Sequence, residues 1–179
     1  VLTDPDLPSG SDRVWAAAQA YDSAGKHDVL VNLQGDMPTL KPETLRAVLA
    51  PLAADPACDI ATLASVIEED HERTDPNVVK AVIAGSPGSG LGRALYFTRA
   101  SAPHGDGPLY HHIGVYAYRR RALAEFVAAE PTGLEHRERL EQLRALELGL
   151  RIDCAIIPGP PPSGVDTPED VEQARQLYR

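Results

Sequence analysis

The clearest candidate for a chemical role is the segment 32–38, Asn-Leu-Gln-Gly-Asp-Met-Pro, where an apolar run gives way to polar residues. Open α/β sheets bind ligands at the carboxyl ends of their strands, and the run 28–33 has the composition of a buried strand. Asp36 is therefore a candidate ligand for a divalent metal, and Gln34 offers a two-sided amide to a bound molecule. An ordinary turn between a strand and a helix is the alternative interpretation.

A second carboxylate, Asp166, has a similar setting near the C-terminus. It follows the apolar run 150–157 and precedes Thr167 and Pro168, which are typical of a helix start. Two carboxylates at separate strand ends can share one Mg²⁺ whose other positions go to phosphate oxygens. Asp166 equally suits the positive end of a helix, so both interpretations stay open.

Small residues before a helix provide a third candidate, Ser-Gly-Ser-Asp-Arg at 9–13. Backbone amides at a helix N-terminus attract anionic groups, and Arg13 adds a fixed cation, so this segment suits a nucleotide. Ser-Gly before a helix is also an ordinary cap, which is the alternative.

A fourth group contains polar residues from several predicted elements: Arg99, His112, Tyr116, Tyr118 and Gln142. Together they suit a pocket for a sugar acid, in which Arg99 would pair with the carboxylate in bidentate fashion. Taken singly, each also suits a structural role. The charged residues at 136–139, with Glu141 and Arg144, are interpreted as a solvated helix face with close charge pairs.

Hydropathy patterns predict the elements that position these residues. Helical spacing covers 12–21, where Ser11 is the expected cap, and Pro42 opens a helix to about residue 53. Further helices are expected over 132–149, after a capping box, and from Thr167 to the C-terminus. Strands are expected at 28–33, 59–66, 78–84, 93–99, 112–118 and 150–157.

This order predicts an α/β fold whose first part is a parallel sheet with right-handed crossovers. The strands 78–84 and 93–99 are expected to form a hairpin around the glycine-rich loop 85–92. That loop lacks the Lys-Ser/Thr pair of a phosphate loop and lies between strands, so we interpret it as a turn.

Composition narrows the class of protein. The 179 residues, 43% of them apolar, suit one domain over 1–179, and the net charge of −9 argues against nucleic acid or an anionic membrane as a partner. No apolar stretch approaches the length of a membrane span. Cys58 and Cys154 are expected to be free buried thiols, which favours a reducing, cytoplasmic location.

Seven segments, in this order, resemble the CMP-KDO synthetases, the family of 3-deoxy-manno-octulosonate (KDO) cytidylyltransferases. The segments are SGSDR at 9–13, VNLQGDMP at 31–38, DPNVVK at 75–80, ALYFTRA at 94–100, HIGVYAYR at 112–119, LEQLRALE at 140–147 and GVDTPED at 164–170. The resemblance implies a nucleotide-diphospho-sugar transferase fold, Rossmann-like, with a mixed sheet flanked by helices. It also implies CTP and KDO as substrates, CMP-KDO and pyrophosphate as products, and a place in lipopolysaccharide synthesis.

The resemblance assigns roles to individual positions. Asp36 and Asp166 match the acids that bind Mg²⁺ and, with Arg99, are expected to be catalytic. The segment beside the nucleotide is matched by Ser9, Gly10 and Arg13. The sugar site is matched by Gln34, Arg99, His112, Tyr116, Glu141 and Gln142. The family is usually a homodimer, and the strands over 93–118 match the dimerising part.

Two departures from the family pattern bear on activity. The family begins with a strand and a basic loop around the triphosphate, which has no counterpart before Val1, so the fold is expected to be truncated N-terminally and this chain alone to be inactive. Met37 also stands where the family usually has an acid. The alternatives are a cytidylyltransferase for another sugar acid, such as sialic acid, and a catalytically inactive binding fragment.

Overall fold

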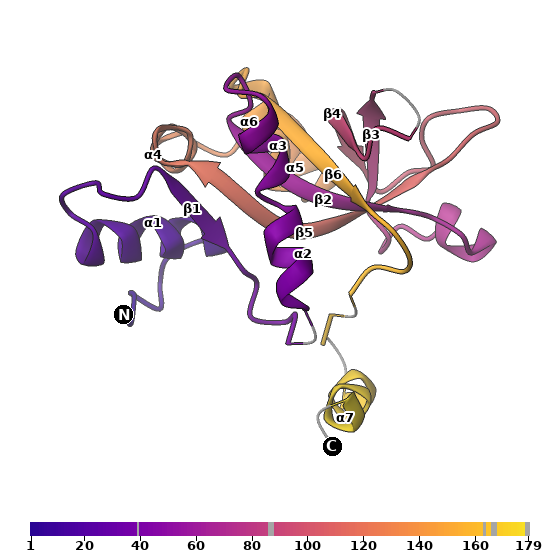
Figure 1. Cartoon of the computed structure of the whole chain (residues 1–179), viewed down its shortest axis with the longest axis horizontal. Coiled ribbons are helices and arrows are strands. Elements are labelled where there is room, and N and C mark those ends of the chain that lie inside the picture. Colours follow the sequence, from indigo (N-terminus) through magenta and orange to yellow (C-terminus); the bar gives the residue numbers. More distant parts are fainter. Residues whose placement is uncertain (39, 86–87, 163, 166–167, 178–179) are drawn as a thin grey trace.

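A six-stranded mixed sheet forms the centre of the computed structural model, which describes residues 1–38, 40–85, 88–162, 164–165 and 168–177 (Figure 1). The strands lie in the order β1-β5-β2-β6-β4-β3, and β3 also pairs with the start of β5, so the sheet curls. Their bounds are β1 Val29–Asn32, β2 Ile60–Val66, β3 Lys80–Ala84, β4 Leu91–Thr98, β5 Tyr110–Arg119 and β6 Ile152–Ile157.

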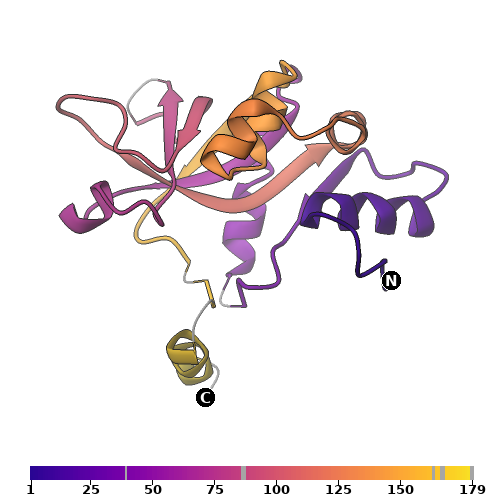
Figure 2. The same cartoon turned by 180° about the vertical axis from the view of Figure 1, so that it is seen from behind.

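Helices cover both faces of this sheet. The helices α2 and α3 pack on one face, while α1, α4, α5 and α6 pack on the other, as the two opposite views show (Figures 1 and 2). The helix bounds are α1 Gly10–Tyr21, α2 Pro42–Ala47, α3 Ala50–Ala54, the 3₁₀ helix η1 Asp70–Arg73, α4 Arg120–Ala128, α5 Gly133–Glu138, α6 Gln142–Glu147 and α7 Pro168–Leu177. None of the helices within the described ranges combines the length and apolar character needed to span a bilayer.

The strand β5 separates two apolar clusters because alternate side chains of a strand point to opposite faces. Tyr116 and Tyr118 belong to the cluster under α4 and α6, while Val115 and Ala117 belong to the cluster under α2 and α3. This alternation also sends His112 to the Tyr116 face, where their rings lie 5.6 Å apart. The strand thereby presents a row of polar and aromatic groups to one side of the sheet.

The sheet is mixed rather than parallel in its first part. β5 lies between β1 and β2 and is antiparallel to both, whereas β2 and β6 form a parallel pair. β1 and β2 therefore run in the same direction, as predicted for the strands at 28–33 and 59–66, although β5 lies between them. β1 is an edge strand, and Val31 keeps 39% of its surface exposed, so the expectation of a strand buried on both faces was wrong.

The hairpin prediction is confirmed, because β3 and β4 pair antiparallel with Lys80 opposite Thr98. The register shifts between Val82 and Ile83. Gly92 sits where the two strands approach closely: a Cβ there would lie 2.4 Å from the Ile83 side chain and 2.8 Å from the Ala84 carbonyl oxygen. Glycine therefore permits the close pairing.

Two predicted helices are each broken in two. The segment 132–149 divides because Arg139 takes a left-handed backbone conformation, φ 57°, which ends α5 before α6 begins. The Glu135 carboxylate accepts a hydrogen bond from the Thr132 backbone N–H at 3.1 Å, as expected for the acid of a capping box. The segment 42–53 likewise forms the two short helices α2 and α3.

Three other helix predictions differ from the structure in detail. The hydroxyl that caps α1 belongs to Ser9, which accepts from the Asp12 N–H at 3.3 Å, and not to Ser11, which is buried. The helix α4 was not predicted, although the spacing of Ala122, Leu123 and Phe126 supplies its buried face. The helix α7 occurs as predicted, while its expected cap, Thr167, lies outside the described residues.

Candidate functional site

A cavity of about 520 Å³ opens where α1, the segment after β1, the middle of β5 and the junction between α5 and α6 meet. Its size suits a small organic molecule. Its wall is formed by Gly10, Gln34, Asp36, Met37, Arg99, His112, Gly114, Tyr116, Arg139, Leu140, Glu141 and Gln142.

Most residues singled out in the sequence meet at this cavity. They come from segments far apart in the chain, and they are Gly10, Gln34, Asp36, Arg99, His112, Tyr116, Glu141 and Gln142. Ser9 lines a neighbouring cavity of about 510 Å³, which shares Arg139, Leu140 and Glu141 with the first.

Three of the sequence candidates lie elsewhere or outside the described part of the chain. Tyr118, expected in the sugar-acid pocket, is 2% exposed in the core and does not line the cavity. The Arg13 guanidinium does not line the cavity; it donates to the carbonyl oxygens of Asp4, Pro5 and Leu7 at 3.0, 2.8 and 3.2 Å, which anchors the N-terminal segment. The structure gives Arg13 a structural contact where a nucleotide contact was expected. Asp166 lies outside the described residues.

Several polar groups of the cavity wall have no hydrogen-bond partner among the described residues. These groups include the side-chain amides of Gln34 and Gln142, the Tyr116 hydroxyl and the Asp36 carboxylate. Gln142 keeps 6% of its surface exposed, and Tyr116 keeps 4%. Polar groups that line a cavity and have no partner in the protein are free to hydrogen-bond a ligand, so this arrangement is typical of a binding site for a polar molecule.

His112 presents a defined tautomer to the cavity. Its Nε2 lies 3.0 Å from the Thr62 hydroxyl, which also lies 3.2 Å and 3.0 Å from the carbonyl oxygens of Ile113 and Val115. Because the hydroxyl proton goes to a carbonyl, Thr62 accepts from Nε2–H, and Nδ1 is left as an acceptor. Burial lowers the pKa of His112 to about 3, so the ring is neutral near pH 7.

The Arg99 guanidinium donates to backbone carbonyl oxygens at the cavity wall and not to a side chain. Its Nε donates to the Glu138 carbonyl oxygen at 2.9 Å, Nη1 to the Pro76 carbonyl at 3.0 Å, and Nη2 to the Arg139 carbonyl at 3.5 Å. The expected bidentate pairing of Arg99 with a ligand carboxylate would have to use its remaining donors. These contacts fix the backbone at the end of α5.

Arg139 is a cation of the cavity wall that sequence reasoning assigned to a solvated helix face. Its guanidinium makes no ion pair or hydrogen bond within the described ranges of the chain. The position of Arg139 depends on its left-handed φ, which no feature of the sequence predicted. Gly114, by contrast, could have been found, because it lies two residues from both His112 and Tyr116 in a strand.

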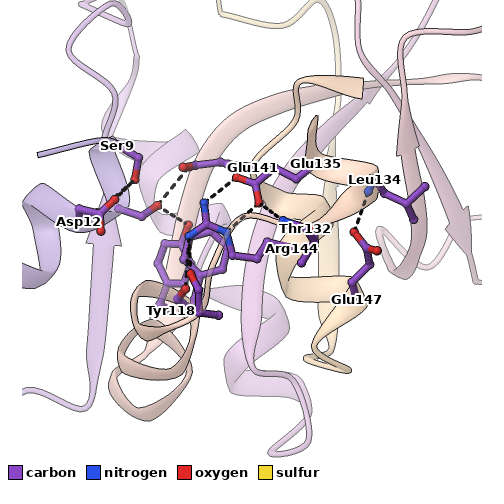
Figure 3. A network of polar contacts seen from close by, with 12 residues as sticks. Ser9, Asp12, Tyr118, Thr132, Leu134, Glu135, Glu141, Arg144 and Glu147 are labelled. Carbon is purple, nitrogen blue, oxygen red and sulfur yellow. Dashed lines mark hydrogen bonds and ion pairs between the residues drawn. The ribbon is translucent and has the colours of Figure 1, made fainter. Parts of the chain in front are cut away.

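The helix-face interpretation was also wrong for Arg144, which is buried. Its Nη2 and Nε donate to the two carboxylate oxygens of Glu135 at 2.5 and 2.8 Å, and its guanidinium lies 4.6 Å from the centre of the Phe126 ring. Arg144 thus joins α5 and α6 to α4 and lines the neighbouring cavity; Figure 3 shows its pairing with Glu135. Glu141, assigned to the same face, lies at the cavity wall.

The Asp36 carboxylate is the candidate metal ligand in the described part of the site. The Asp36 residue is exposed. The Val165 N–H donates to the Asp36 carbonyl oxygen at 2.8 Å, so the backbone at Val165 lies next to the segment that follows β1. Within the described residues no group of three or more His, Cys, Asp or Glu side chains is arranged to hold a metal. A site with few protein oxygens and open positions is the kind that suits Mg²⁺.

The matching family model and two relatives of high identity name one activity. A family model described as cytidylyltransferase matches residues 1–152. The chain is 58% identical over 179 residues to a 3-deoxy-manno-octulosonate cytidylyltransferase of Paramagnetospirillum magneticum and 62% identical over 177 residues to one of Rhodospirillum centenum. It covers 72% and 68% of the lengths of these relatives.

Solved structures agree in fold. A CMP:2-keto-3-deoxy-manno-octonic acid synthetase in complex with CTP is 32% identical, has a TM-score of 0.87, and is matched over 99% of this chain and 71% of that chain. A 4-diphosphocytidyl-2C-methyl-D-erythritol synthase, 15% identical with a TM-score of 0.57 over 97% of this chain and 68% of that chain, shares the fold alone. These likenesses confirm the expected nucleotidyltransferase fold.

Proposed function

The chain belongs to the cytidylyltransferase family, and we propose that it transfers CMP from CTP to KDO and releases pyrophosphate. The anomeric hydroxyl oxygen of KDO forms a bond to the α-phosphorus of CTP, and the bond from that phosphorus to the oxygen of pyrophosphate breaks. The hydroxyl proton passes to solvent. No protein nucleophile takes part, so catalysis depends on positioning and on stabilising charge.

The observation that carries this proposal is the cavity whose unpartnered polar groups match a sugar acid. The amides of Gln34 and Gln142 can each donate and accept, Nδ1 of His112 accepts, and the Tyr116 hydroxyl does both. A polyhydroxylated sugar presents the complementary donors and acceptors. Glu141 adds a carboxylate acceptor for a sugar hydroxyl.

The carboxylate of the sugar acid requires a positive partner. Arg99 and Arg139 are the two cations of the cavity wall, and three donors of Arg99 are already engaged by carbonyls. We assign the carboxylate to the remaining Arg99 donors together with the unpartnered Arg139 guanidinium. Arg99 also positions Arg139 by donating from Nη2 to the Arg139 carbonyl oxygen.

The nucleotide is assigned to the side of the cavity formed by α1. Gly10 lines the cavity at the first turn of this helix, where backbone N–H groups favour an anionic phosphate. A Cβ at Gly10 would lie 3.4 Å from both the Asn32 and the Gln34 side chains, so a larger residue would crowd this wall. Ser9 supports the same end as the helix cap.

Asp36 and Asp166 are the residues that would hold Mg²⁺ in this site. When bound, Mg²⁺ would neutralise charge on the phosphates and lower the pKa of the attacking hydroxyl. Asp36 fits this role because its carboxylate is exposed and free of protein partners in the described residues. Met37 beside it packs against the core.

The metal assignment predicts the effect of Asp36→Asn. In a chain extended N-terminally to the length of its relatives, we expect kcat to fall by about a hundredfold or more, because one charged ligand is lost, with no change in melting temperature. Binding of Mn²⁺, followed by electron paramagnetic resonance, should weaken in parallel. Asp106→Asn is the matched control, because Asp106 is exposed and lies away from the cavity. Unchanged Mn²⁺ affinity in Asp36→Asn would refute the metal role.

Substrate choice is tested by supplying CTP with KDO or with sialic acid. In a chain extended N-terminally to the length of its relatives, we expect pyrophosphate release and CMP-sugar formation with KDO. With sialic acid we expect kcat/KM to be at least about a hundredfold lower, because mismatched polar groups stay unpaired. Equal turnover of both sugars would contradict the assignment of KDO. Calorimetric titration of KDO measures sugar binding separately from turnover.

The proposal also covers the location of the enzyme and its oligomeric state. KDO activation serves lipopolysaccharide synthesis, and we propose that the enzyme works in the cytoplasm as a homodimer that pairs through β4 and β5. The exposure of Leu95 on β4, 55%, supports this choice of surface. Sedimentation analysis of Leu95→Lys against the unaltered protein tests the dimer.

A further inference from the structure

Glu141 lines the cavity, and its carboxylate is joined to the core by a hydrogen-bonded chain of side chains that runs through Ser11 to Tyr118. Figure 3 marks these contacts as dashed lines. The Ser11 hydroxyl lies 3.1 Å from Glu141 Oε1 and 3.2 Å from the Tyr118 hydroxyl. Ser11 has no exposed surface and Tyr118 has 2%. The three residues come from α1, β5 and the N-cap of α6, so the chain links elements far apart in the sequence.

The direction of the protons follows from the chemistry of the groups. An ionised carboxylate can only accept, so Ser11 donates its single proton to Glu141. The Tyr118 hydroxyl must then donate to Ser11, and burial raises the pKa of Tyr118, which keeps that proton in place. Tyr118, Ser11 and Glu141 therefore form a chain with one polarity.

Glu141 has no ion-pair partner among the described residues, which makes the hydroxyl contact important. The nearby Arg144 spends two donors on Glu135, and Asp12 accepts the Ser9 hydroxyl at 2.6 Å. Burial raises the pKa of Glu141, while the hydroxyl of Ser11 and the charge of Arg144 act against that rise. The charged and titratable groups around Glu141 are Asp12 from α1, Tyr116 and Tyr118 from β5, Glu135 from α5, Arg139 between α5 and α6, and Arg144 from α6.

We propose that Ser11 and Tyr118 are positioning residues that hold the Glu141 carboxylate in one orientation at the sugar-acid side of the cavity. This rests on the proposed function for the identity of the sugar, but not for the hydrogen-bonded chain itself. Loss of the Ser11 hydroxyl removes a donor from a buried carboxylate, which favours the protonated acid and frees the side chain to rotate.

The test compares Ser11→Ala and Tyr118→Phe with Ser65→Ala. Ser65 is a matched control because it is also fully buried, and its hydroxyl has no hydrogen-bond partner in the described part of the chain. The pH titration of the Glu141 carboxyl carbon is followed by ¹³C NMR in the chain without ligand. Its signal is assigned by its loss in Glu141→Gln.

We expect the Glu141 midpoint to rise by about one pH unit in Ser11→Ala, the scale of one hydrogen bond to a charged group, and by less in Tyr118→Phe. Calorimetry should show KDO binding weakened about tenfold in Ser11→Ala at neutral pH. Ser65→Ala should change neither quantity. A merely structural contribution of Ser11 would alter melting temperature without moving the midpoint.

Three outcomes separate this inference from the proposed function. An unchanged Glu141 midpoint in a folded Ser11→Ala overturns the inference, and if that variant fails to fold, an unchanged midpoint in Tyr118→Phe does so. Equal KDO affinity in the unaltered chain and both variants overturns the positioning role. A shifted midpoint in a chain that does not bind KDO supports the hydrogen-bonded chain and refutes the choice of sugar.

Discussion

Gly114 offers a way to fill the cavity without disturbing the fold. It lies on β5 between His112 and Tyr116, lines the cavity, and a Cβ placed there would meet no atom within 4 Å. We expect Gly114→Ala to weaken KDO binding about tenfold, because a methyl group occupies space that the ligand needs.

The measurement is a calorimetric titration with melting temperature as the check on folding. Gly133→Ala is the matched control, since a Cβ at Gly133 also meets open space and this residue, on α5, does not line the cavity. Undiminished KDO affinity in Gly114→Ala would show that the ligand binds elsewhere.

Individual site residues were predictable where the residue type and its place after a strand both pointed to a ligand. Asp36 and Gln34 follow β1, and both line the cavity. Arg13 and Arg99 show the limit of this reasoning, because an arginine has five donors and backbone carbonyls compete for them. Only coordinates reveal which acceptors lie within reach.

At the scale of elements, the pair of Arg144 and Glu135 holds α5 to α6. Arg144 is 7% exposed, so Arg144→Met would leave a carboxylate largely buried without its cation. We expect the free energy of unfolding to fall by about 3 kcal/mol, within the range for breaking a buried pair. Urea denaturation measures this change.

Arg175→Met provides the comparison, because Arg175 and its partner Glu172 are both exposed, with 63% and 61% of their side-chain surfaces accessible. That substitution should cost less than about 1 kcal/mol. Equal costs for the two substitutions would contradict the view that burial of Arg144 decides its contribution.

Asp22 joins the end of α1 to the start of α4 and should make stability depend on acid pH. Its carboxylate accepts from the backbone N–H groups of Lys26 and His27 and from Arg120 Nη1, at 2.9 Å each. The backbone hydrogen bond from His27, followed by that from Lys26, lowers the pKa of Asp22 to about 2.

Because the folded pKa lies below the unfolded value of about 3.9, this stabilisation is present above pH ~4 and is lost as the pH falls toward ~2. Asp22→Asn should therefore lower the melting temperature at pH 7 and differ progressively less from the unaltered protein below pH ~4. A difference in melting temperature that stays constant from pH 7 to pH 2 would exclude this linkage.

Element predictions succeeded where one physical signal dominated and failed where tertiary contacts decided. Alternation and a glycine-rich loop identified the β3–β4 hairpin, because its pairing is local. The break at Arg139 was not predictable, since a left-handed arginine is disfavoured locally and the Arg99 contact to its carbonyl helps to hold it. The placement of β5 between β1 and β2 depends on a strand more than 40 residues further along the chain, beyond local pattern.

The two cysteines lie in the two apolar clusters on opposite faces of the sheet, so their reactivity can be used to follow the unfolding of each face. Cys154 belongs to the cluster that contains Phe97 and Leu143, and Cys58 belongs to the one that contains Leu63. Both thiols are free and fully buried, as the sequence predicted. Burial raises the pKa of Cys58 to about 12 and raises that of Cys154 as well.

We expect both thiols to react with Ellman's reagent at pH 8 roughly a thousandfold more slowly than an exposed cysteine, because few thiolates form and the reagent has no access. If the sheet and its two clusters unfold as one unit, the two thiols should become reactive over the same range of urea concentration. Cys58→Ala and Cys154→Ala isolate each signal, with far-ultraviolet circular dichroism as the reference transition. Reaction of one thiol at a lower urea concentration than the other would show that the two faces of the sheet unfold separately, and β5, which contributes side chains to both, would then mark the boundary.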